Sequence, residues 1–267
     1  MKTYKGAITL NRNNRGCYIL DTVKGCPGGA LHGGRGCYGD CYAKNIASRY
    51  GFAFDNPVSR NFENNTDQLW LFGLTDKTHT TKIIDEISNA DMPFIRIGEM
   101  GDPSSDWGHT INICREIYRA NKKIVIITKH WGRIPDKFLS LVSRMGLFIN
   151  TSVSALDDER LLNLRVREFE RLKNICHSIL RIVSCDFNTE HQVGNRFAAI
   201  QHELFKMAPY IDTVFRPNGG NGFVVDNIIN TKKEMFLSKY ALVSRFNQNA
   251  YLGYCGTCPD LCGISNT

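Results

Sequence analysis

The sequence predicts an α/β fold in which helices cover a parallel sheet, arranged as a partial barrel of six strand–helix units. After residue 90, short apolar runs alternate with amphipathic stretches of helical period, which is typical of parallel strands joined by helices. The length of 267 residues suits one large domain better than two ordinary ones. We therefore expect a single domain over 1–267, with a Cys-rich loop at 25–44 and a Cys-rich tail at 251–267.

The expected elements follow one another in a regular order. Continuous apolar runs such as Ile124-Val125-Ile126-Ile127 indicate buried strands. We expect strands at 17–20, 94–97, 124–127, 147–153, 179–183 and 212–215. Ser104 and Asp106 are suited to cap a helix, and Pro135 fits a first helical turn. We expect helices at 81–90, 104–120, 135–145, 156–174, 190–207 and 231–246.

The composition excludes several classes of protein. Hydrophobic residues make up 42% of the chain, which excludes a disordered protein. No apolar run approaches the roughly 20 residues of a membrane span, and residues 1–6 carry no hydrophobic signal, so we expect a cytoplasmic protein without a membrane partner. The 33 Lys and Arg residues exceed the 26 Asp and Glu residues, a surplus that is compatible with a nucleic-acid partner. The mixed charges of 157–173 are typical of a solvated helix face.

The ten cysteines favour a metal-binding protein over a disulfide-bonded one, because the cytosol keeps thiols reduced. Three of them, Cys26, Cys37 and Cys41, lie in one glycine-rich loop. Three thiolates without an adjacent fourth ligand suit a [4Fe–4S] cluster with one open iron. His32 lies in the same loop and would complete a zinc site, so both metals stay open at this point.

The tail carries a second group of cysteines, Cys255, Cys258 and Cys262, with the spacing C-x2-C-x3-C. This spacing, with Gly and Pro between the thiols, is typical of a metal site. We expect a second iron–sulfur cluster, or zinc with a fourth ligand from Cys17 or a histidine. A further alternative is that the tail donates a ligand to the first loop.

Polar residues follow the expected strands, at the carboxyl ends where parallel α/β sheets bind their ligands. Glu99 and Asp102 come directly after a buried strand, where a carboxylate is costly unless it binds something. The other candidates at strand ends are Gly98, Lys129, His130, Ser152, Ser154, Cys185, Asp186 and Arg216. Of these, Lys129 suits a carboxylate or phosphate group, and His130 suits proton transfer.

The segment Cys37-x3-Cys41-Tyr42-Ala43 resembles the cluster loop of the radical S-adenosylmethionine (radical SAM) superfamily, and most closely its phage and prophage branch, whose loop ends in Cys-Tyr-Ala. With Cys26 as the first ligand the spacing is C-x10-C-x3-C, whereas the common spacing of the superfamily is C-x3-C-x2-C. The segment 98–103 is similar to the Gly-Gly-Glu-Pro segment that contacts the SAM amino group in that family.

The resemblance implies a partial (βα)6 barrel in which Cys26, Cys37 and Cys41 hold a [4Fe–4S] cluster and SAM occupies the open iron. One-electron reduction, from a flavodoxin or ferredoxin, would then cleave SAM to a 5′-deoxyadenosyl radical that abstracts a substrate hydrogen. Gly98, Glu99, Asp102, Lys129, Ser152, Ser154, Asp186 and Arg216 are the expected contacts to SAM or substrate. Cys185 is the candidate hydrogen-atom donor.

Two other functions are open on the sequence alone. One is a zinc-containing barrel transglycosylase that acts on nucleic-acid bases, with Asp102 or Asp186 as its nucleophile. The other is a non-catalytic, zinc-stabilised nucleic-acid-binding module. Metal analysis separates them from the first hypothesis, because zinc gives a colourless protein whereas an iron–sulfur cluster is brown.

Overall fold

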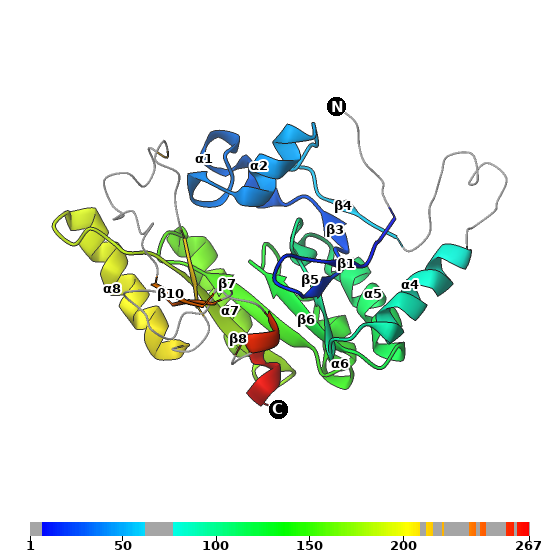
Figure 1. The fold of residues 1–267 in the computed structure, drawn as a ribbon. Helices are drawn as coiled ribbons and strands as arrows, with labels where there is room; N and C mark the ends of the chain where they lie inside the picture. Colours follow the sequence, from blue (N-terminus) through cyan, green and yellow to red (C-terminus); the bar gives the residue numbers. More distant parts are fainter. Residues whose placement is uncertain are drawn as a thin grey trace.

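A mostly parallel sheet forms the centre of the computed structural model (Figure 1). The structure describes residues 7–61, 77–208, 212–215, 221, 235–238, 241–243, 255–258 and 261–266. In spatial order the strands are β1 (Asn11–Arg12), β2 (Tyr18–Ile19), β5 (Phe94–Ile97), β6 (Lys123–Thr128), β7 (Phe148–Val153), β8 (His177–Ser184) and β9 (Asp212–Val214). From β2 to β9 neighbouring strands are parallel, and β1 adds an antiparallel edge. The predicted parallel α/β sheet of six strands is confirmed, and its closure as a partial barrel stays a prediction.

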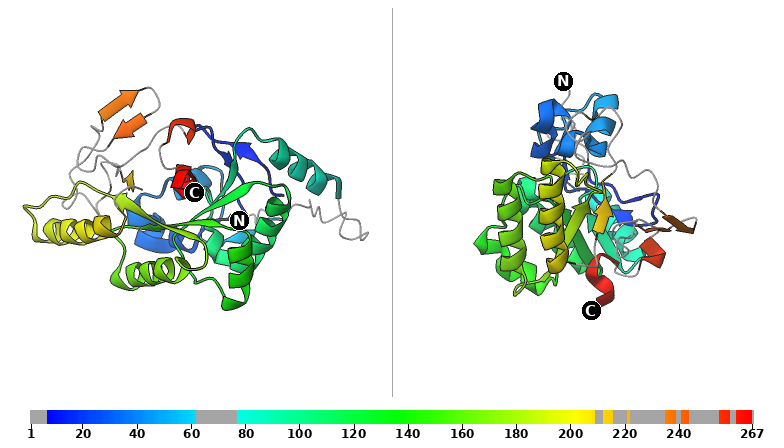
Figure 2. Two further views of the ribbon diagram at one scale, coloured as in Figure 1. Left: turned by 90° about the horizontal axis from the view of Figure 1, so that it is seen from below. Right: turned by 90° about the vertical axis from the view of Figure 1, so that its left-hand side faces the viewer.

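Helices connect the parallel strands. They are α4 (Lys77–Asn89), α5 (Trp107–Arg119), α6 (Leu139–Arg144), α7 (Glu159–Leu172) and α8 (Gln192–Met207). Because the parallel strands lie side by side in chain order and such crossovers are right-handed, the crossover helices fall on one face of the sheet. In the right-hand view of Figure 2, α7 and α8 lie to one side of the sheet and the red C-terminal segment lies to the other.

The helix-covered face holds the larger core. Ile95, Ile97, Ile124, Ile126 and Ile149 alternate along their strands and are buried against the helices. This alternation follows from the two-residue period of a strand, which sends successive side chains to opposite faces. Burying such isoleucines contributes about 1.5–3 kcal/mol each.

The opposite face, which we call the inner face, carries Phe94, Val125, Phe148 and Ile179. Ile264 of the C-terminal segment η6 (Leu261–Asn266) packs into this cluster. A face without crossover helices must be covered by another segment, and here the tail contributes to that cover.

The Cys-rich loop lies over the carboxyl ends of the strands. It contains η1 (Pro27–Ala30), α1 (Leu31–Gly34), η2 (Cys37–Gly39) and α2 (Tyr42–Arg49). Two short antiparallel strands, β3 (Val23–Lys24) and β4 (Val58–Ser59), frame it. A backbone bridge between Gly25 and Gly101 connects the start of the loop to the end of β5. Figure 1 shows α1 and α2 together above the sheet.

Several element predictions were wrong in detail. The predicted helix at 231–246 contains two antiparallel strands instead, β10 (Met235–Ser238) and β11 (Ala241–Val243). Each is a short apolar run, and such runs do not distinguish helix from strand by period. Helix α7 begins at Glu159 rather than at 156, because the carboxylate of Asp158 accepts a hydrogen bond from the Leu161 N–H at 2.9 Å and caps the helix there.

The described helices do not meet the requirements of a membrane span. Among those the structure describes, none has both the length and the apolar character that spanning a bilayer requires.

Candidate functional site

The three loop cysteines lie at turns of the glycine-rich loop. Cys26 precedes η1 and donates its N–H to the carbonyl of Phe54 at 2.7 Å, and Cys41 precedes α2. A Cβ atom added to Gly28 would lie 3.1 Å from Cys37 Sγ, and one added to Gly36 would lie 2.3 Å from Cys41 Cβ. Glycine is therefore required where the loop folds back on its own cysteines.

The thiols of the loop are close enough to affect one another. Burial raises the pKa of Cys26, and negative charge on Asp102, Cys37 or Cys41 raises it further. Burial also raises the pKa of Cys37, while Lys129 opposes this increase. Within the described ranges, no three His, Cys, Asp or Glu side chains are already gathered as a metal site. A metal would therefore have to displace the thiol protons and draw the sulfurs together.

Tyr38 anchors the loop to the sheet. It is buried, its backbone φ is +58°, and its hydroxyl donates to Asp157 Oδ1 at 2.8 Å. The Lys129 ammonium donates to the same hydroxyl. The side-chain amide of Asn221, itself buried, donates to the Tyr38 carbonyl at 2.8 Å. The residue after Cys37 is thus held by three distant segments of the chain.

The Asp157 carboxylate is the centre of this anchor. Arg165 Nη1 lies 2.6 Å from Asp157 Oδ1, and the Ser154 N–H donates to Asp157 Oδ2 at 2.9 Å. Burial alone would raise the pKa of Asp157, but Lys129 and Arg165 outweigh this effect and lower it. The expectation that 157–173 is a solvated face was wrong for Arg165, whose side chain is only 1% exposed. The spacing of the charged residues along this stretch could not reveal that Arg165 pairs with Asp157, which lies before the helix.

Sequence reasoning missed Tyr38, Asp157, Arg165 and Asn221 as parts of the site. The one signal that could have identified Tyr38 is its place between two candidate ligands, Cys37 and Cys41. Asp157 and Arg165 lie in a charge-rich helical stretch that predicts solvent exposure, so no local signal distinguishes them.

The segment after β5 also contacts the loop. The carboxylate of Asp21 accepts the N–H groups of Glu99 and Met100, at 2.7 and 3.0 Å. The Tyr42 hydroxyl donates to the carbonyl of Glu99. Glu99 Oε2 accepts a hydrogen bond from Asn13 Nδ2 at 3.0 Å and lies 3.8 Å from an Arg96 nitrogen. Glu99 is therefore a half-buried carboxylate directly beside the residue that follows Cys41.

Asp102 serves the fold at its strand end. Its Oδ1 accepts hydrogen bonds from the Ser104 N–H at 3.0 Å and from the Thr128 hydroxyl at 2.6 Å. Its Oδ2 accepts the Lys129 N–H at 2.8 Å. Oδ1 thus caps η3 (Pro103–Asp106), and both oxygens connect the ends of β5 and β6. This engagement of both oxygens gives no support to Asp102 as a nucleophile.

The two serines at the end of β7 differ in their partners. The Ser154 hydroxyl donates to the Val183 carbonyl at 2.8 Å and is fully buried. Ser152 pairs in register with Arg181 of β8 and is also buried. Ser152 and Arg181 therefore belong to the inner face, whereas Ser154 braces the turn that carries Asp157.

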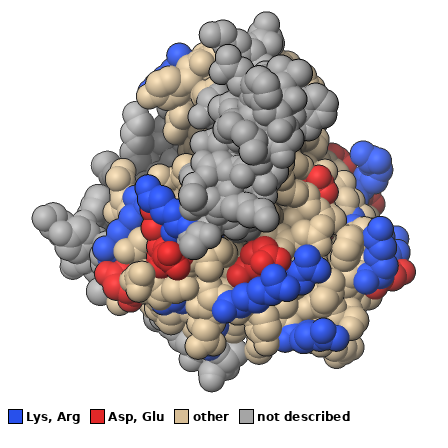
Figure 3. Space-filling view, turned by 90° about the vertical axis from the view of Figure 1, so that its right-hand side faces the viewer, with Lys and Arg blue, Asp and Glu red and all other residues tan. Residues whose placement is uncertain are grey.

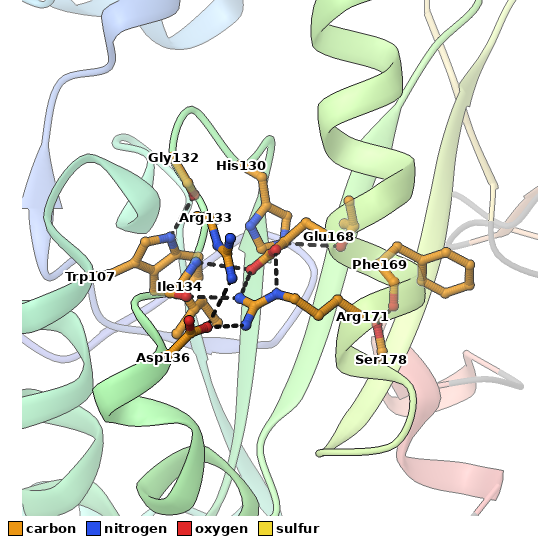
Figure 4. A network of polar contacts seen from close by, with 11 residues as sticks. Trp107, His130, Gly132, Arg133, Ile134, Asp136, Glu168, Phe169, Arg171 and Ser178 are labelled. Carbon is orange, nitrogen blue, oxygen red and sulfur yellow. Dashed lines mark hydrogen bonds and ion pairs between the residues drawn. The ribbon is translucent and has the colours of Figure 1, made fainter.

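His130 lies on the helix side of the sheet, so the expectation of a proton-transfer group at the ligand-binding edge was wrong. Its Nε2 lies 3.1 Å from the Thr151 hydroxyl, and its ring is 5.4 Å from that of Trp107. Figure 4 shows it beside Glu168, whose carboxylate is bonded to Arg171 and to the Ile134 N–H. Burial lowers the pKa of His130 to about 4, so the ring is neutral at physiological pH.

Cys185 lies in the same apolar cluster as Tyr38, Phe187 and the partly buried Cys37. Its main chain is held by Gln201, whose side-chain oxygen accepts the Cys185 N–H at 2.7 Å. The structure thus places the candidate hydrogen donor close to the loop. Asp186 is half-buried at the same strand end. Arg216 falls outside the described residues.

The tail cysteines meet Cys17 on the inner face. Cys17, Cys255 and Cys262 share one cluster with Phe148 and Ile264. The Cys17 and Cys255 thiols are hydrogen-bonded to each other, and this contact lowers the pKa of Cys255 to about 6 and raises that of Cys17. The structure therefore places Cys17 beside Cys255 and Cys262, and a metal held there stays a prediction.

A cavity of about 270 Å³ opens between α2, the β3–β4 pair and the segment after β5. Phe52, Phe54 and Met100 line it, together with the charged Asp21 and Lys24. The Lys24 ammonium lies 3.4 Å from the centre of the Phe52 ring. A mostly apolar pocket with a few charged groups is the usual form of a small-molecule site.

The face drawn in Figure 3 shows basic and acidic side chains close together across its described part. Ion pairs on the helices reflect this, such as Lys82–Glu86 on α4 at 3.9 Å and Arg119–Glu116 on α5 at 2.7 Å. Such mixing balances charge locally and does not build a broad basic surface there.

Comparison of the chain with models of protein families, with curated proteins and with solved structures finds no match.

Proposed function

We propose that this protein is a radical SAM enzyme that generates a 5′-deoxyadenosyl radical to modify its substrate. The observation that carries the proposal is the placement of Cys26, Cys37 and Cys41. One glycine-rich loop presents these three thiols over the carboxyl ends of parallel strands that follow one another in chain order. That edge is where α/β enzymes bind ligands.

The residues present fit an iron–sulfur cluster. The donors are three thiols, the ligand type that such clusters require. Gly28 and Gly36 leave no side chain between the cysteines. Lys129 and Arg165, which act on the charge of Cys37, would stabilise an anionic thiolate-bound group. With SAM bound, the cluster would supply one-electron cleavage of SAM and hydrogen abstraction, with a flavodoxin or ferredoxin as the electron donor.

The residues of the chain would orient and shield the ligands. Glu99, turned towards Arg96 and Asn13, offers a carboxylate to the SAM amino group. The Tyr42 hydroxyl holds the carbonyl of Glu99 and so keeps this segment against the loop. Cys185, in the apolar cluster around Tyr38, is placed to return a hydrogen atom to the substrate. The net charge favours a nucleic acid or nucleotide as substrate.

Anaerobic reconstitution of the full chain with iron and sulfide tests the proposal. We expect brown protein with thiolate-to-iron absorption, and release of methionine and 5′-deoxyadenosine when SAM and dithionite are added. Alanine at Cys26, Cys37 or Cys41 should remove the loop cluster and abolish this release, while Cys176→Ala, on the helix side of the sheet, should not. A protein that releases no 5′-deoxyadenosine, or a Cys26→Ala variant with wild-type release, contradicts the assignment.

The SAM contact is tested by titration of the reconstituted protein. Glu99→Gln removes a charge-assisted hydrogen bond of about 1.5–3 kcal/mol, which weakens SAM binding by roughly one to two orders of magnitude. Ser154→Ala should have less effect, because its hydroxyl is bonded to the Val183 carbonyl. Equal SAM affinities for wild type and Glu99→Gln would remove Glu99 from the site.

A further inference from the structure

We propose that Cys17, Cys255, Cys258 and Cys262 hold a second metal centre on the inner face, separate from the loop. Cys17 precedes β2 at one edge of the parallel strands, and the other three thiols arrive from the end of the chain. The fold therefore brings Cys17 together with Cys255 and Cys262, from which it is separated by more than two hundred residues in sequence, and a bound metal would draw these sulfurs and that of Cys258 into one site.

The tail is held in place by main-chain contacts. The Cys255 N–H donates to the Arg15 carbonyl at 2.8 Å, two residues before Cys17. The Cys258 N–H donates to the Cys255 carbonyl at 3.2 Å, which folds the C-x2-C segment into a tight turn. The Cys262 carbonyl accepts a hydrogen bond from Asn150 Nδ2 of β7 at 3.1 Å. These bonds use main-chain groups of the tail and not its thiols.

The polar groups around the cysteines point to a bound group as well. Asn150 is fully buried, and its Oδ1 has no hydrogen-bond partner in the described part of the chain. The same holds for the buried Nε of Arg96. Buried polar atoms without partners are rare in native proteins and indicate a missing water, ion or ligand. Both lie on the inner face beside Cys17 and Cys262.

The charges suit a centre with four thiolates. A dication bound by four thiolates has a net charge of −2, as does a [4Fe–4S]²⁺ cluster with four cysteine ligands. Arg181 Nη1 lies 3.8 Å from Cys262 Sγ, and Arg96 faces Cys17 and Cys262, so two guanidinium groups offset that charge. Four protein ligands leave no open coordination position, which is the mark of a structural centre. On binding, each thiol releases its proton.

The experiment isolates this centre from the loop. The full chain with Cys26, Cys37 and Cys41 all changed to alanine is produced anaerobically with zinc, iron and sulfide present, and its metal content is measured. We expect one zinc per chain, or about four irons with matching sulfide. Either result supports the centre and identifies its metal. A further Cys17→Ser change should lower the metal content at least tenfold, and the control Cys176→Ser should leave it unchanged.

Three results would overturn the proposal: a folded loop variant without metal, full metal content after Cys17→Ser, or full metal content after Cys258→Ser. Circular dichroism establishes that each variant is folded, and if Cys17→Ser does not fold, Cys17→His keeps a metal-binding side chain and should retain the metal. The radical SAM proposal fails separately, through absent 5′-deoxyadenosine in the wild type, because the two centres share no cysteine.

Discussion

The two cysteine groups of this protein differ in the contacts that hold them. Side chains from distant strands fix the loop, through Tyr38, Asp157 and Arg165. The tail is held through its own main-chain groups: the Cys255 N–H donates to the Arg15 carbonyl, and the Cys262 carbonyl accepts from the Asn150 side chain. A group held by a charged network can be tuned by its surroundings, whereas one held by the backbone mainly ties two segments together.

The loop and the tail also differ in the number of thiols that they offer to a metal. The loop offers three thiols at the ligand-binding edge of the sheet, next to Glu99 and a cavity. In the tail group, Cys17, Cys255 and Cys262 lie together on the inner face, and Cys258 is the proposed fourth ligand. Three ligands leave a coordination position for a substrate, and four close the centre. On the two proposals above, the loop carries the chemistry and the tail adds stability, and the following predictions test that division.

The largest expected effect is on Arg165. Arg165→Met removes the partner of the buried Asp157, and breaking a buried ion pair in this way costs about 3–5 kcal/mol of unfolding free energy. Because Asp157 holds Tyr38, the loop cluster should also lose iron faster. Urea unfolding and the rate of iron loss to a chelator measure the two effects. The control Arg167→Met, on the exposed side of the same helix, should change neither.

The tail should not respond to Arg165→Met. Its metal content is expected to match that of wild type, since its contacts run to Arg15, Asn150 and Arg181. Equal loss of metal from both centres would show that the loop and the tail form one cooperative unit. That result would contradict the separate roles proposed for them.

The strands were predictable because their sequences are unusually apolar. The run 124–127 lies inside the observed β6, and the chain order of the predicted strands is their order in the sheet. The loop cysteines stood out by type and spacing. The short strands β1, β3 and β4 were not predicted, because two-residue strands carry no periodic signal.

The anchor of the loop was not predictable from local sequence. Tyr38 and Asp157 lie 119 positions apart, and Lys129 and Tyr38 lie 91 apart. Helical period also fails for α7, where the charged residues Arg165 and Glu168 are both buried because each has a partner on another segment. Only the folded chain reveals such pairs.

The next effect is smaller and concerns the way in which stability depends on pH through His130. His130 is followed by Trp131, whose ring contacts Arg165 at 5.0 Å and would meet a side chain at Gly28. Burial lowers the pKa of His130 to about 4, against the opposing influence of Glu168 and Asp102 and with that of Arg165. The unfolded chain thus binds a proton more readily than the folded one, and stability falls as the pH drops.

The contribution of His130 should be complete above about pH 6.5 and decline towards about pH 4, by at most about 1.4 kcal/mol per pH unit. Unfolding free energies in urea between about pH 7 and about pH 5 measure it. His130→Gln, which does not titrate there, should have the flatter profile. Identical slopes for the two proteins would mean that His130 does not control the acid response beneath the loop.

The smallest expected effect falls on Tyr38 itself. Tyr38→Phe keeps the buried ring but removes the hydroxyl that donates to Asp157 and accepts from Lys129. Since Asp157 retains Arg165, the loss should be that of an ordinary hydrogen bond, about 0.5–1.5 kcal/mol. The reconstituted loop cluster should release iron faster while the tail keeps its metal, and the exposed Tyr50→Phe serves as control. If Tyr38→Phe leaves the rate of iron loss unchanged, the hydroxyl contributes only to folding, and the loop is held by Asn221 and the backbone instead.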